Sequence, residues 1–143
     1  MDPDFDTTTQ EYVEIIYDLQ KINKVARVKD IAKKRGVTRS SVSTALTFLK
    51  KKKLVNHETY GLVELTDSGN KLGEELEKRH EIIKDFFLNI LNIDHNIAEE
   101  NACIVEHYID KKVLDSLVNF IDFIKNKPEW LSQFKNSPGN YTR

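Results

Sequence analysis

The stretch VKDIAKKRGVTRSSVSTALTFLKKKK, residues 28–53, contains two short helical patterns separated by a glycine. The first pattern stops at Gly36, a residue type that can close a helix in the left-handed conformation. The second begins after a hydroxyl residue, Thr38 or Ser40, that can cap a helix. Both have apolar residues at three- and four-residue spacing: Val28, Ile31, Ala32, Val42, Ala45, Leu46 and Leu49. Two short helices joined by a glycine-containing turn predict a helix-turn-helix.

The periodicity of the sequence changes directly after this motif. The stretch LVNHETYGLVELT, residues 54–66, contains two short β-branched runs with Tyr60-Gly61 at the bend. This pattern predicts a β-hairpin. A hairpin in this position is the wing of a winged helix. Before the motif, a helix is predicted over about residues 11–22, with Thr8 or Thr9 as its cap.

The second half of the chain predicts three more helices, over about residues 70–91, 97–109 and 111–125, and a short apolar segment around Trp130. Their apolar stripes are wider than packing on a small winged helix needs. A surplus apolar face on a DNA-binding chain is typical of a dimer interface. The predicted fold class is therefore mainly α with a small β-hairpin wing: an N-terminal winged helix-turn-helix and a C-terminal helical dimerisation domain.

The net charge of −1 over 143 residues conceals a strong asymmetry. Residues 21–53 contain twelve basic residues and one acid, whereas the rest of the chain has 10 basic and 22 acidic residues. This indicates a polyanion-binding face, although a solvated charged surface is the plainer alternative. A single cysteine, an acidic polar N-terminus and no apolar run near the roughly 20 residues of a membrane span favour a cytoplasmic protein.

The outer side of the second helix of the motif is rich in short hydroxyl side chains, which allow close approach to base edges and phosphates. Lysines at its end suit contacts to the DNA backbone, and Arg39 can bind guanine or a phosphate. Serine and threonine enrichment alone is weak evidence, since exposed helices often have it. The predicted DNA-binding residues are Lys29, Thr38, Arg39, Ser40, Ser41, Ser43, Thr44, Thr47, Lys50, Lys51 and Lys52.

A second constellation lies in CIVEHYI, residues 103–109, where Cys103, Glu106 and His107 share one face of a predicted helix. Taken singly, each has an ordinary structural explanation: a buried small thiol, a surface carboxylate and a partly buried imidazole. Taken together, they are a plausible ligand set for a metal.

Further donors strengthen the metal hypothesis. Glu11 and Glu14 lie three residues apart on the first predicted helix, and His80 lies within the long helix over residues 70–91. Carboxylate, imidazole and thiolate donors suit Fe(II), Mn(II), Co(II) or Zn(II). The sequence has no CxxC, so the pattern is not that of a structural zinc site.

At these residues the chain resembles the diphtheria toxin repressor family, in the short manganese-transport-regulator form without an SH3-like domain. The resemblance rests on TTTQEYVEIIYDL, VKDIAKKRGVTRSSVSTAL, YGLVELTDSGNKLG, KRHEIIKDFF and NACIVEHYID. It implies a homodimeric, metal-dependent repressor that binds a palindromic operator and controls metal homeostasis genes. The implied domains are a DNA-binding domain over residues 1–70 and a metal-binding and dimerisation domain over residues 71–143. The implied metal ligands are Glu11, Glu14, His80, Cys103, Glu106 and His107.

The resemblance is to two branches of the family at once. Glu11 and Glu14 resemble the manganese type, whereas Cys103 resembles the iron type. Lys84 stands where family members tend to have glutamate, so the number of bound metals stays open. The expected cofactor is Fe(II) or Mn(II), with Co(II), Ni(II) or Zn(II) as substitutes in vitro.

The positions of the donors in the sequence suggest a mechanism. Glu11 and Glu14 precede the DNA-binding motif, and the other donors follow it. A metal that joins them would fix the first helix, and the winged helix with it, against the dimerisation helices. The two recognition helices of a dimer would then match successive major grooves, and metal would shift the population toward this form.

Two other functions remain open from the sequence. A small metalloenzyme could use the same donors, but it needs an open coordination position and a nucleophile or base nearby. A winged-helix regulator could instead sense a ligand other than a metal, with the donors retained as packing residues. The sequence has no glycine-rich loop and no unassigned catalytic cluster, so we expect no enzymatic activity.

Overall fold

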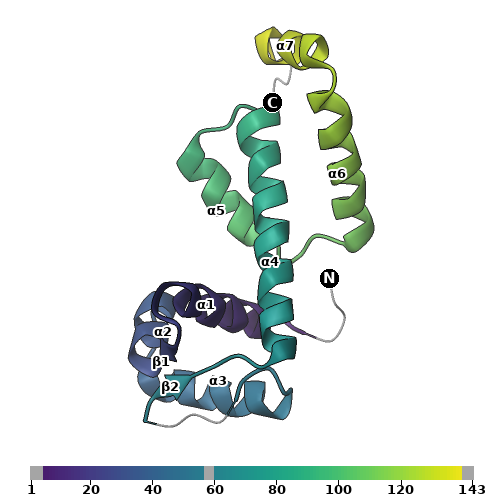
Figure 1. Ribbon diagram of the computed structural model, residues 1–143. Helices are drawn as coiled ribbons and strands as arrows, with labels where there is room; N and C mark the ends of the chain where they lie inside the picture. Colours follow the sequence, from purple (N-terminus) through teal and green to yellow (C-terminus); the bar gives the residue numbers. More distant parts are fainter. Residues whose placement is uncertain (1–4, 57–59, 140–143) are drawn as a thin grey trace. The chain divides into compact units, whose positions relative to one another are not determined.

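The computed structural model describes residues 5–56 and 60–139 and divides into two compact units. One unit covers residues 2–78, and the other begins at Arg79. Helix α4, Asp67–Asp85, contains this boundary, so its beginning belongs to the first unit and its end to the second. The mainly helical fold with a small antiparallel sheet confirms the predicted fold class (Figure 1).

The first unit, hereafter the winged-helix unit, contains α1 (Thr7–Asn23), α2 (Val28–Arg35) and α3 (Arg39–Lys51). Gly36 ends α2 with a φ of 74°, and its N–H donates to Ala32 O at 2.9 Å, as the glycine turn predicted. Of the two candidate caps for α3, Thr38 is the one used, because its Oγ1 accepts from Ser41 N at 3.1 Å.

The prediction that Thr8 or Thr9 caps the first helix is wrong. The helix begins at Thr7, and Asp6 is its cap, since Asp6 Oδ1 accepts from Thr9 N at 2.7 Å. Thr8 and Thr9 lie inside the first turn, so neither is the cap. Carboxylates and hydroxyls are comparable as caps, and the sequence has both side by side.

The predicted wing is present in shortened form. Val55 and Leu65 form an antiparallel bridge between the two arms. At the bend, Tyr60 and Gly61 have φ values of 55° and 75°, the left-handed region that tight hairpin turns use. His57, which is not among the predicted metal ligands, lies outside the described residues.

One strand of the wing was not predicted. Residues Ala26–Arg27 form β1, which pairs antiparallel with β2, Leu62–Val63, in the register Ala26 with Val63. Two residues are too few for a β-period to be visible in the sequence. The strand joins the start of α2 to the wing, because Val28 N also donates to Gly61 O at 3.0 Å.

The core of the winged-helix unit is continuous from α1 to the start of α4. Ile16, Ile31, Leu46 and Leu54 are among its fully buried side chains. Each fully buried side chain of this size contributes about 1.5–3 kcal/mol. The core thereby holds α3 in place with its polar side outward.

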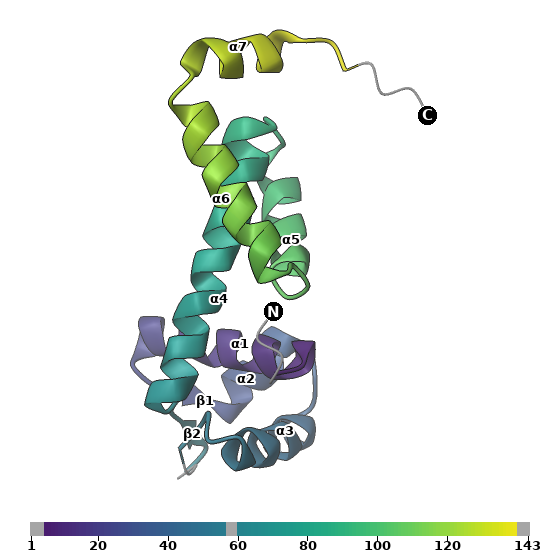
Figure 2. The same ribbon diagram turned by 90° about the vertical axis from the view of Figure 1, so that its right-hand side faces the viewer.

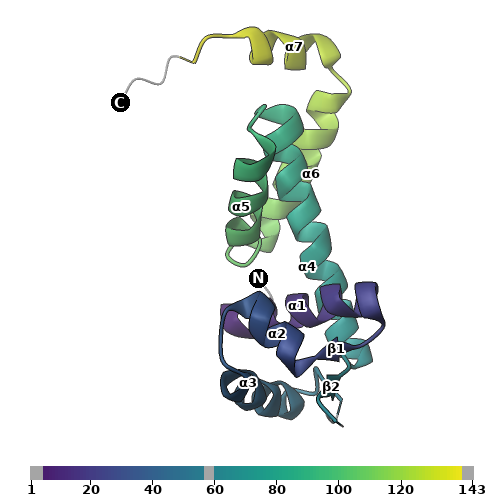
Figure 3. The same ribbon diagram turned by 90° about the vertical axis from the view of Figure 1, so that its left-hand side faces the viewer.

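The second unit, hereafter the helical unit, contains the end of α4, the π-helical turn η1 (Phe86–Ile90), α5 (His95–Val105), α6 (Lys111–Lys125) and α7 (Pro128–Asn136). Helices α5 and α6 lie on different sides of the C-terminal half of α4 (Figures 1 and 3). Helix α7 turns away from the axis of α6 (Figure 2). Within the described ranges, no helix is long and apolar enough to cross a membrane.

The ends of two predicted helices differ in the helical unit. The long helix predicted over residues 70–91 is α4 followed by η1, a change to wider helical hydrogen bonding at Phe86. The helix predicted over residues 97–109 is α5, which ends at Val105. Glu106 and His107 therefore follow the helix rather than lie inside it.

Candidate metal centre and DNA-binding face

His80, near the end of α4, is the centre of the donor cluster in the helical unit. Its Nδ1 lies 3.2 Å from Glu106 Oε2 and 3.8 Å from Cys103 Sγ. Its Nε2 lies 2.8 Å from Glu99 Oε1. The two ring nitrogens thus have different partners: Nδ1 faces the predicted ligands, and Nε2 faces a carboxylate that was not predicted.

Glu106 and His107 lie directly after α5 and are both buried. Glu106 is fully enclosed at 0% exposure and acts as the C-cap of α5, with its N–H donating to Ala102 O at 3.0 Å. His107 Nε2 lies 3.3 Å from Glu106 Oε1. Each oxygen of the Glu106 carboxylate therefore faces an imidazole nitrogen.

The observed burial of Cys103 and Glu106 is the opposite of what the ordinary structural explanation of these residues predicts. Cys103 is exposed, not a buried thiol, and Glu106 is enclosed, not a surface carboxylate. An enclosed carboxylate needs positive charge or strong donors nearby, because burial of an unpaired charge costs several kcal/mol. Cys103 is exposed and its Sγ lies 3.8 Å from His80 Nδ1, so burial in an apolar core does not explain the thiol.

The carboxylates favour positive charge at this place. They raise the pKa of His80 to about 9, chiefly through the hydrogen bond with Glu106 and in smaller part through Glu99, against the opposing effect of burial. His80 therefore carries a proton at neutral pH in the metal-free protein. A divalent ion placed at Nδ1 would take over the charge that this proton supplies.

Glu99 is a functional candidate that the sequence analysis missed. Its Oε2 lies 2.9 Å from Lys84 Nζ, and this ion pair is the main reason that the pKa of Glu99 is lowered. Its other oxygen meets His80. Glu99 stands four residues before Cys103, on the same face of α5, and this spacing was the available signal.

The residues of the cluster fit a divalent transition metal. Donor atoms of His80, Glu99 and Cys103 lie within 4.8 Å of one another. Imidazole nitrogen, carboxylate oxygen and thiolate sulfur are the ligand types that first-row divalent ions take in proteins. The helical unit thus brings together four of the six predicted ligands: His80, Cys103, Glu106 and His107.

The two other predicted ligands, Glu11 and Glu14, belong to α1 in the winged-helix unit. Glu11 is already paired, with its Oε2 2.5 Å from the Arg35 guanidinium. Glu14 is half-buried. His95, left out of the predicted site, is the first residue of α5 and is exposed.

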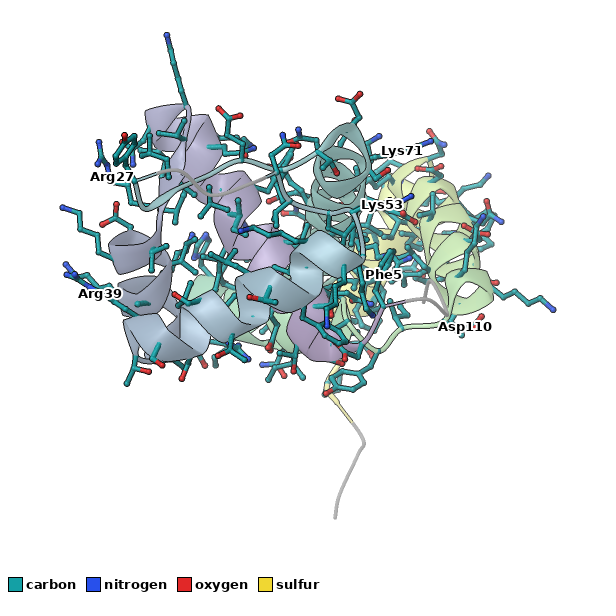
Figure 4. The ribbon with its side chains drawn as sticks, turned by 90° about the horizontal axis from the view of Figure 1, so that it is seen from below. Phe5, Arg27, Arg39, Lys53, Lys71 and Asp110 are labelled. Carbon is teal, nitrogen blue, oxygen red and sulfur yellow. The ribbon has the colours of Figure 1, made fainter. Side chains whose placement is uncertain are left out.

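The predicted DNA-binding face is built on α3. Figure 4 shows α3 across one face of the winged-helix unit, with Arg39 at one end and Lys53 beyond the other. The hydroxyls of Thr44 and Thr47 donate to the carbonyls of Ser40 and Ser43, each at 3.1 Å. Their oxygens remain able to accept hydrogen bonds, so we expect base amino groups rather than phosphates as their partners.

A depression of about 440 Å³ lies between the start of α3 and the wing. It is lined by Arg27, Val28, Lys29, Arg39, Ser43, Tyr60 and Gly61. Arg27 and Tyr60 were not among the predicted DNA-binding residues. Three cationic side chains around one hollow suit a phosphate group, and Tyr60 at the wing tip is almost fully exposed.

Several basic residues of the segment 21–53, hereafter the basic block, have partners within the protein. Lys34 Nζ pairs with Asp18 at 2.9 Å, as Arg35 does with Glu11. The Lys52 ammonium lies 5.3 Å and 5.0 Å from the ring centroids of Phe5 and Phe48. These contacts are typical of cation–π pairs and hold Lys52 close to the protein surface.

Fold and site together define a class of protein: transcriptional regulators that bind DNA in response to a divalent metal ion. The model of the N-terminal DNA-binding domain of iron-dependent repressors matches residues 4–63. The model of their metal-binding and dimerisation domain matches residues 66–135. The chain belongs to the iron-dependent repressor family, so it is a metal-dependent, dimeric DNA-binding regulator.

Among its relatives are manganese regulators. The HTH-type transcriptional regulator MntR of Listeria welshimeri is 31% identical over 126 residues, 88% of each chain. That of Bacillus pumilus is also 31% identical, over 88% of this chain and 87% of the relative.

Solved structures similar to this chain also include manganese regulators. The manganese regulator SloR is 28% identical, with a TM-score of 0.69 over 80% of this chain and 54% of that chain. A manganese-dependent transcriptional repressor in complex with manganese is 26% identical, with a TM-score of 0.72 over 80% and 53%. This chain thus spans about half the length of each of these two structures.

Proposed function

We propose that this protein is a repressor whose operator binding requires Fe(II) or Mn(II) held by His80, Cys103, Glu106 and His107. The observation that carries the proposal is the position of His80 Nδ1, which lies 3.2 Å from an enclosed carboxylate oxygen and 3.8 Å from an exposed thiol. We keep Glu11 and Glu14 in the proposed ligand set, as the family resemblance implies. When bound, the ion supplies the positive charge that the Glu106 carboxylate otherwise receives from protonated imidazole.

The residues around the ion have separable tasks in this proposal. The imidazole of His80 supplies a neutral nitrogen donor once it releases its proton, so binding of the ion there releases a proton. His107 supplies a second imidazole nitrogen. Glu106 supplies the enclosed charge that makes the site favour a cation. Cys103 supplies the soft donor, which shifts preference from Mn(II) toward Fe(II) and Co(II).

The DNA-binding part of the proposal assigns readout of bases to α3 and phosphate contacts to its two ends. The depression beside the wing adds Arg27 and Tyr60 to the predicted set. Residues 1–70 then form the DNA-binding domain, and residues 71–143 bind the metal and the second subunit. We place the protein in the cytoplasm, where its operators are, and expect no catalytic activity.

Metal and DNA binding are coupled by linkage. A metal ion strengthens operator binding only to the extent that its affinity for the DNA-binding conformation exceeds its affinity for the conformation that does not bind DNA. The operator must then strengthen metal binding by the same factor. This reciprocity separates a metal-dependent repressor from a winged-helix protein with an incidental metal site.

The test begins with selection of a binding site from random DNA duplexes in the presence of Mn(II) or Fe(II). Binding of the selected duplex is then measured by fluorescence anisotropy with metal and with a chelator. We expect at least about a tenfold loss of affinity with the chelator, a coupling of about 1.4 kcal/mol or more. Equal affinity in both conditions would refute the proposed function.

The role of Cys103 is tested in the same assay. Cys103→Glu replaces the soft donor with a hard one, so the protein should become more responsive to Mn(II) relative to Co(II). Cys103→Ala should abolish the sulfur charge-transfer absorption of the Co(II) complex. An unchanged spectrum would show that the thiol does not bind the metal.

A further inference from the structure

The helical unit contains a chain of three polar side chains that ends at the metal cluster: Lys84, Glu99 and His80. Lys84 and His80 lie one turn apart on α4, and Glu99 reaches them from α5. Lys84 Nζ lies 2.9 Å from Glu99 Oε2, and Glu99 Oε1 lies 2.8 Å from His80 Nε2. One carboxylate therefore bridges an ammonium and an imidazole.

We infer that Glu99 is a positioning residue rather than a metal ligand: held by Lys84, it fixes His80 so that Nδ1 is the nitrogen that binds the metal. The inference rests on the proposed metal site and adds residues that hold a ligand in place without contacting the metal. Glu99 also lies among donor atoms that could hold an ion with His80 and Cys103, so the two roles have to be distinguished.

The geometry around His80 favours the positioning role. Glu99 meets Nε2, whereas Cys103 and Glu106 both face Nδ1. The two nitrogens of an imidazole point away from each other, so an ion at Nδ1 and a carboxylate at Nε2 are on different sides of the ring. A ligating histidine commonly donates its other N–H to a carboxylate in this way, which fixes both ring orientation and tautomer.

The ion pair with Lys84 supports the same role. It gives the second oxygen of Glu99 a cationic partner, so a metal would have to displace the ammonium to bind there. Lys84 is more enclosed than a surface lysine, with a side-chain exposure of 21%, and Glu81 lies 3.7 Å away as a further partner. The ion pair thus fixes Glu99 between α4 and α5.

The experiment compares Glu99→Ala with Glu99→Gln in Co(II) titrations of the full-length protein. The alanine variant loses the acceptor for His80 Nε2–H, and we expect Co(II) affinity to fall by roughly 10- to 100-fold. The glutamine variant keeps an amide oxygen as acceptor, so most of this loss should be recovered. Lys84→Gln should fall between the wild type and Glu99→Ala.

Two matched controls separate this effect from general changes of charge. Glu100→Ala removes the adjacent exposed carboxylate of α5, and Lys78→Gln removes an exposed lysine of α4 that pairs with Glu74. Both should bind Co(II) within about twofold of the wild type. Thermal unfolding of every metal-free variant checks that the fold is retained.

A spectroscopic measurement tests the assigned nitrogen directly. In long-range proton–nitrogen spectra of the Zn(II)-loaded protein, His80 should have a protonated Nε2 and a metal-bound Nδ1. This pattern should persist in Glu99→Gln and be lost or mixed in Glu99→Ala.

Three results would overturn the inference. The first is metal bound to Nε2 of His80. The second is an equal loss of Co(II) affinity in Glu99→Ala and Glu99→Gln, which would make Glu99 a direct ligand. The third is no loss of Co(II) affinity in Glu99→Ala. Each of these results can occur while the wild-type protein still needs metal for operator binding. Failure of the inference about Glu99 is therefore distinguishable from failure of the proposed function.

Discussion

The two units of this protein differ in what stabilises them. Among the described residues of the winged-helix unit, seventeen buried apolar residues form one cluster that extends over every element from α1 to α4. In the helical unit, the corresponding cluster has three buried residues, Ile90, Ile121 and Ile124, with partly buried neighbours. Four of the six buried polar side chains among the described residues, Arg79, His80, Glu106 and His107, lie in the helical unit.

Exposed apolar side chains show the same difference. Among the described residues, the winged-helix unit has three large exposed hydrophobic residues, Ile22, Phe48 and Tyr60. The helical unit has ten: Leu91, Ile93, Ile97, Ile104, Tyr108, Val113, Phe120, Phe123, Trp130 and Phe134. Apolar surface of this extent is typical of a subunit interface. The winged-helix unit thus has a large core of its own, whereas the helical unit has a small core and a large exposed apolar surface.

The largest effect should come from the core of the winged-helix unit. Leu46→Ala removes a fully buried side chain of α3 and should lower the free energy of unfolding by about 2–5 kcal/mol. Leu117→Ala, in the partly buried shell of the small cluster, should cost less than half of that. Chemical denaturation of the metal-free proteins gives both values. Similar costs would show that the two units are packed alike.

The next largest effect concerns the metal cluster. His107→Ala removes a buried imidazole beside Glu106 and should weaken binding of every activating metal by at least about 100-fold, or about 2.7 kcal/mol. Metal titration followed by operator binding measures this loss. His95→Ala, at the exposed start of α5, is the matched control and should bind metal normally.

The pH dependence of stability should come from the helical unit. The pKa of His80 is raised to about 9 in the folded protein, from 6.5 for a free side chain. The stabilising effect of this proton is therefore complete below about pH 6.5 and is lost as pH rises through 9. We expect the metal-free protein to lose on the order of 2 kcal/mol over this interval.

Urea denaturation between pH 6.5 and pH 9 measures this loss. His80→Gln should flatten the dependence, because the titrating group is absent, while His95→Gln should leave it unchanged. Metal affinity should rise over the same interval, since the ion competes with the proton at Nδ1. A stability that increases toward pH 9 would contradict the assigned partners of His80.

The smallest effect distinguishes lysines within the basic block. Lys51→Ala, at the exposed end of α3, should lower the salt dependence of DNA binding by up to about one unit in the log–log slope. Lys34→Ala should leave the slope unchanged, because Lys34 pairs with Asp18 of α1. Equal slopes for the two variants would mean that DNA contacts extend over the whole block.

The sequence by itself determined the elements whose signals are local. Helix periodicity, the glycine after α2 and the Thr38 cap depend on residues within one or two turns, so the helix-turn-helix was predicted closely. The spacing of Cys103, Glu106 and His107 was local as well. It predicted a candidate ligand set from neighbouring residues, even though α5 ends before Glu106 and His107.

Only the tertiary structure decided which groups are enclosed and which face one another. The strand β1 exists because Arg27 lies beside Leu62, 35 residues later in the chain. The exposure of Cys103, the burial of Glu106 and the link from Lys84 through Glu99 to His80 likewise depend on packing of α5 against α4. Such pairings are set by burial and charge between distant segments, for which a single sequence has no periodic signal.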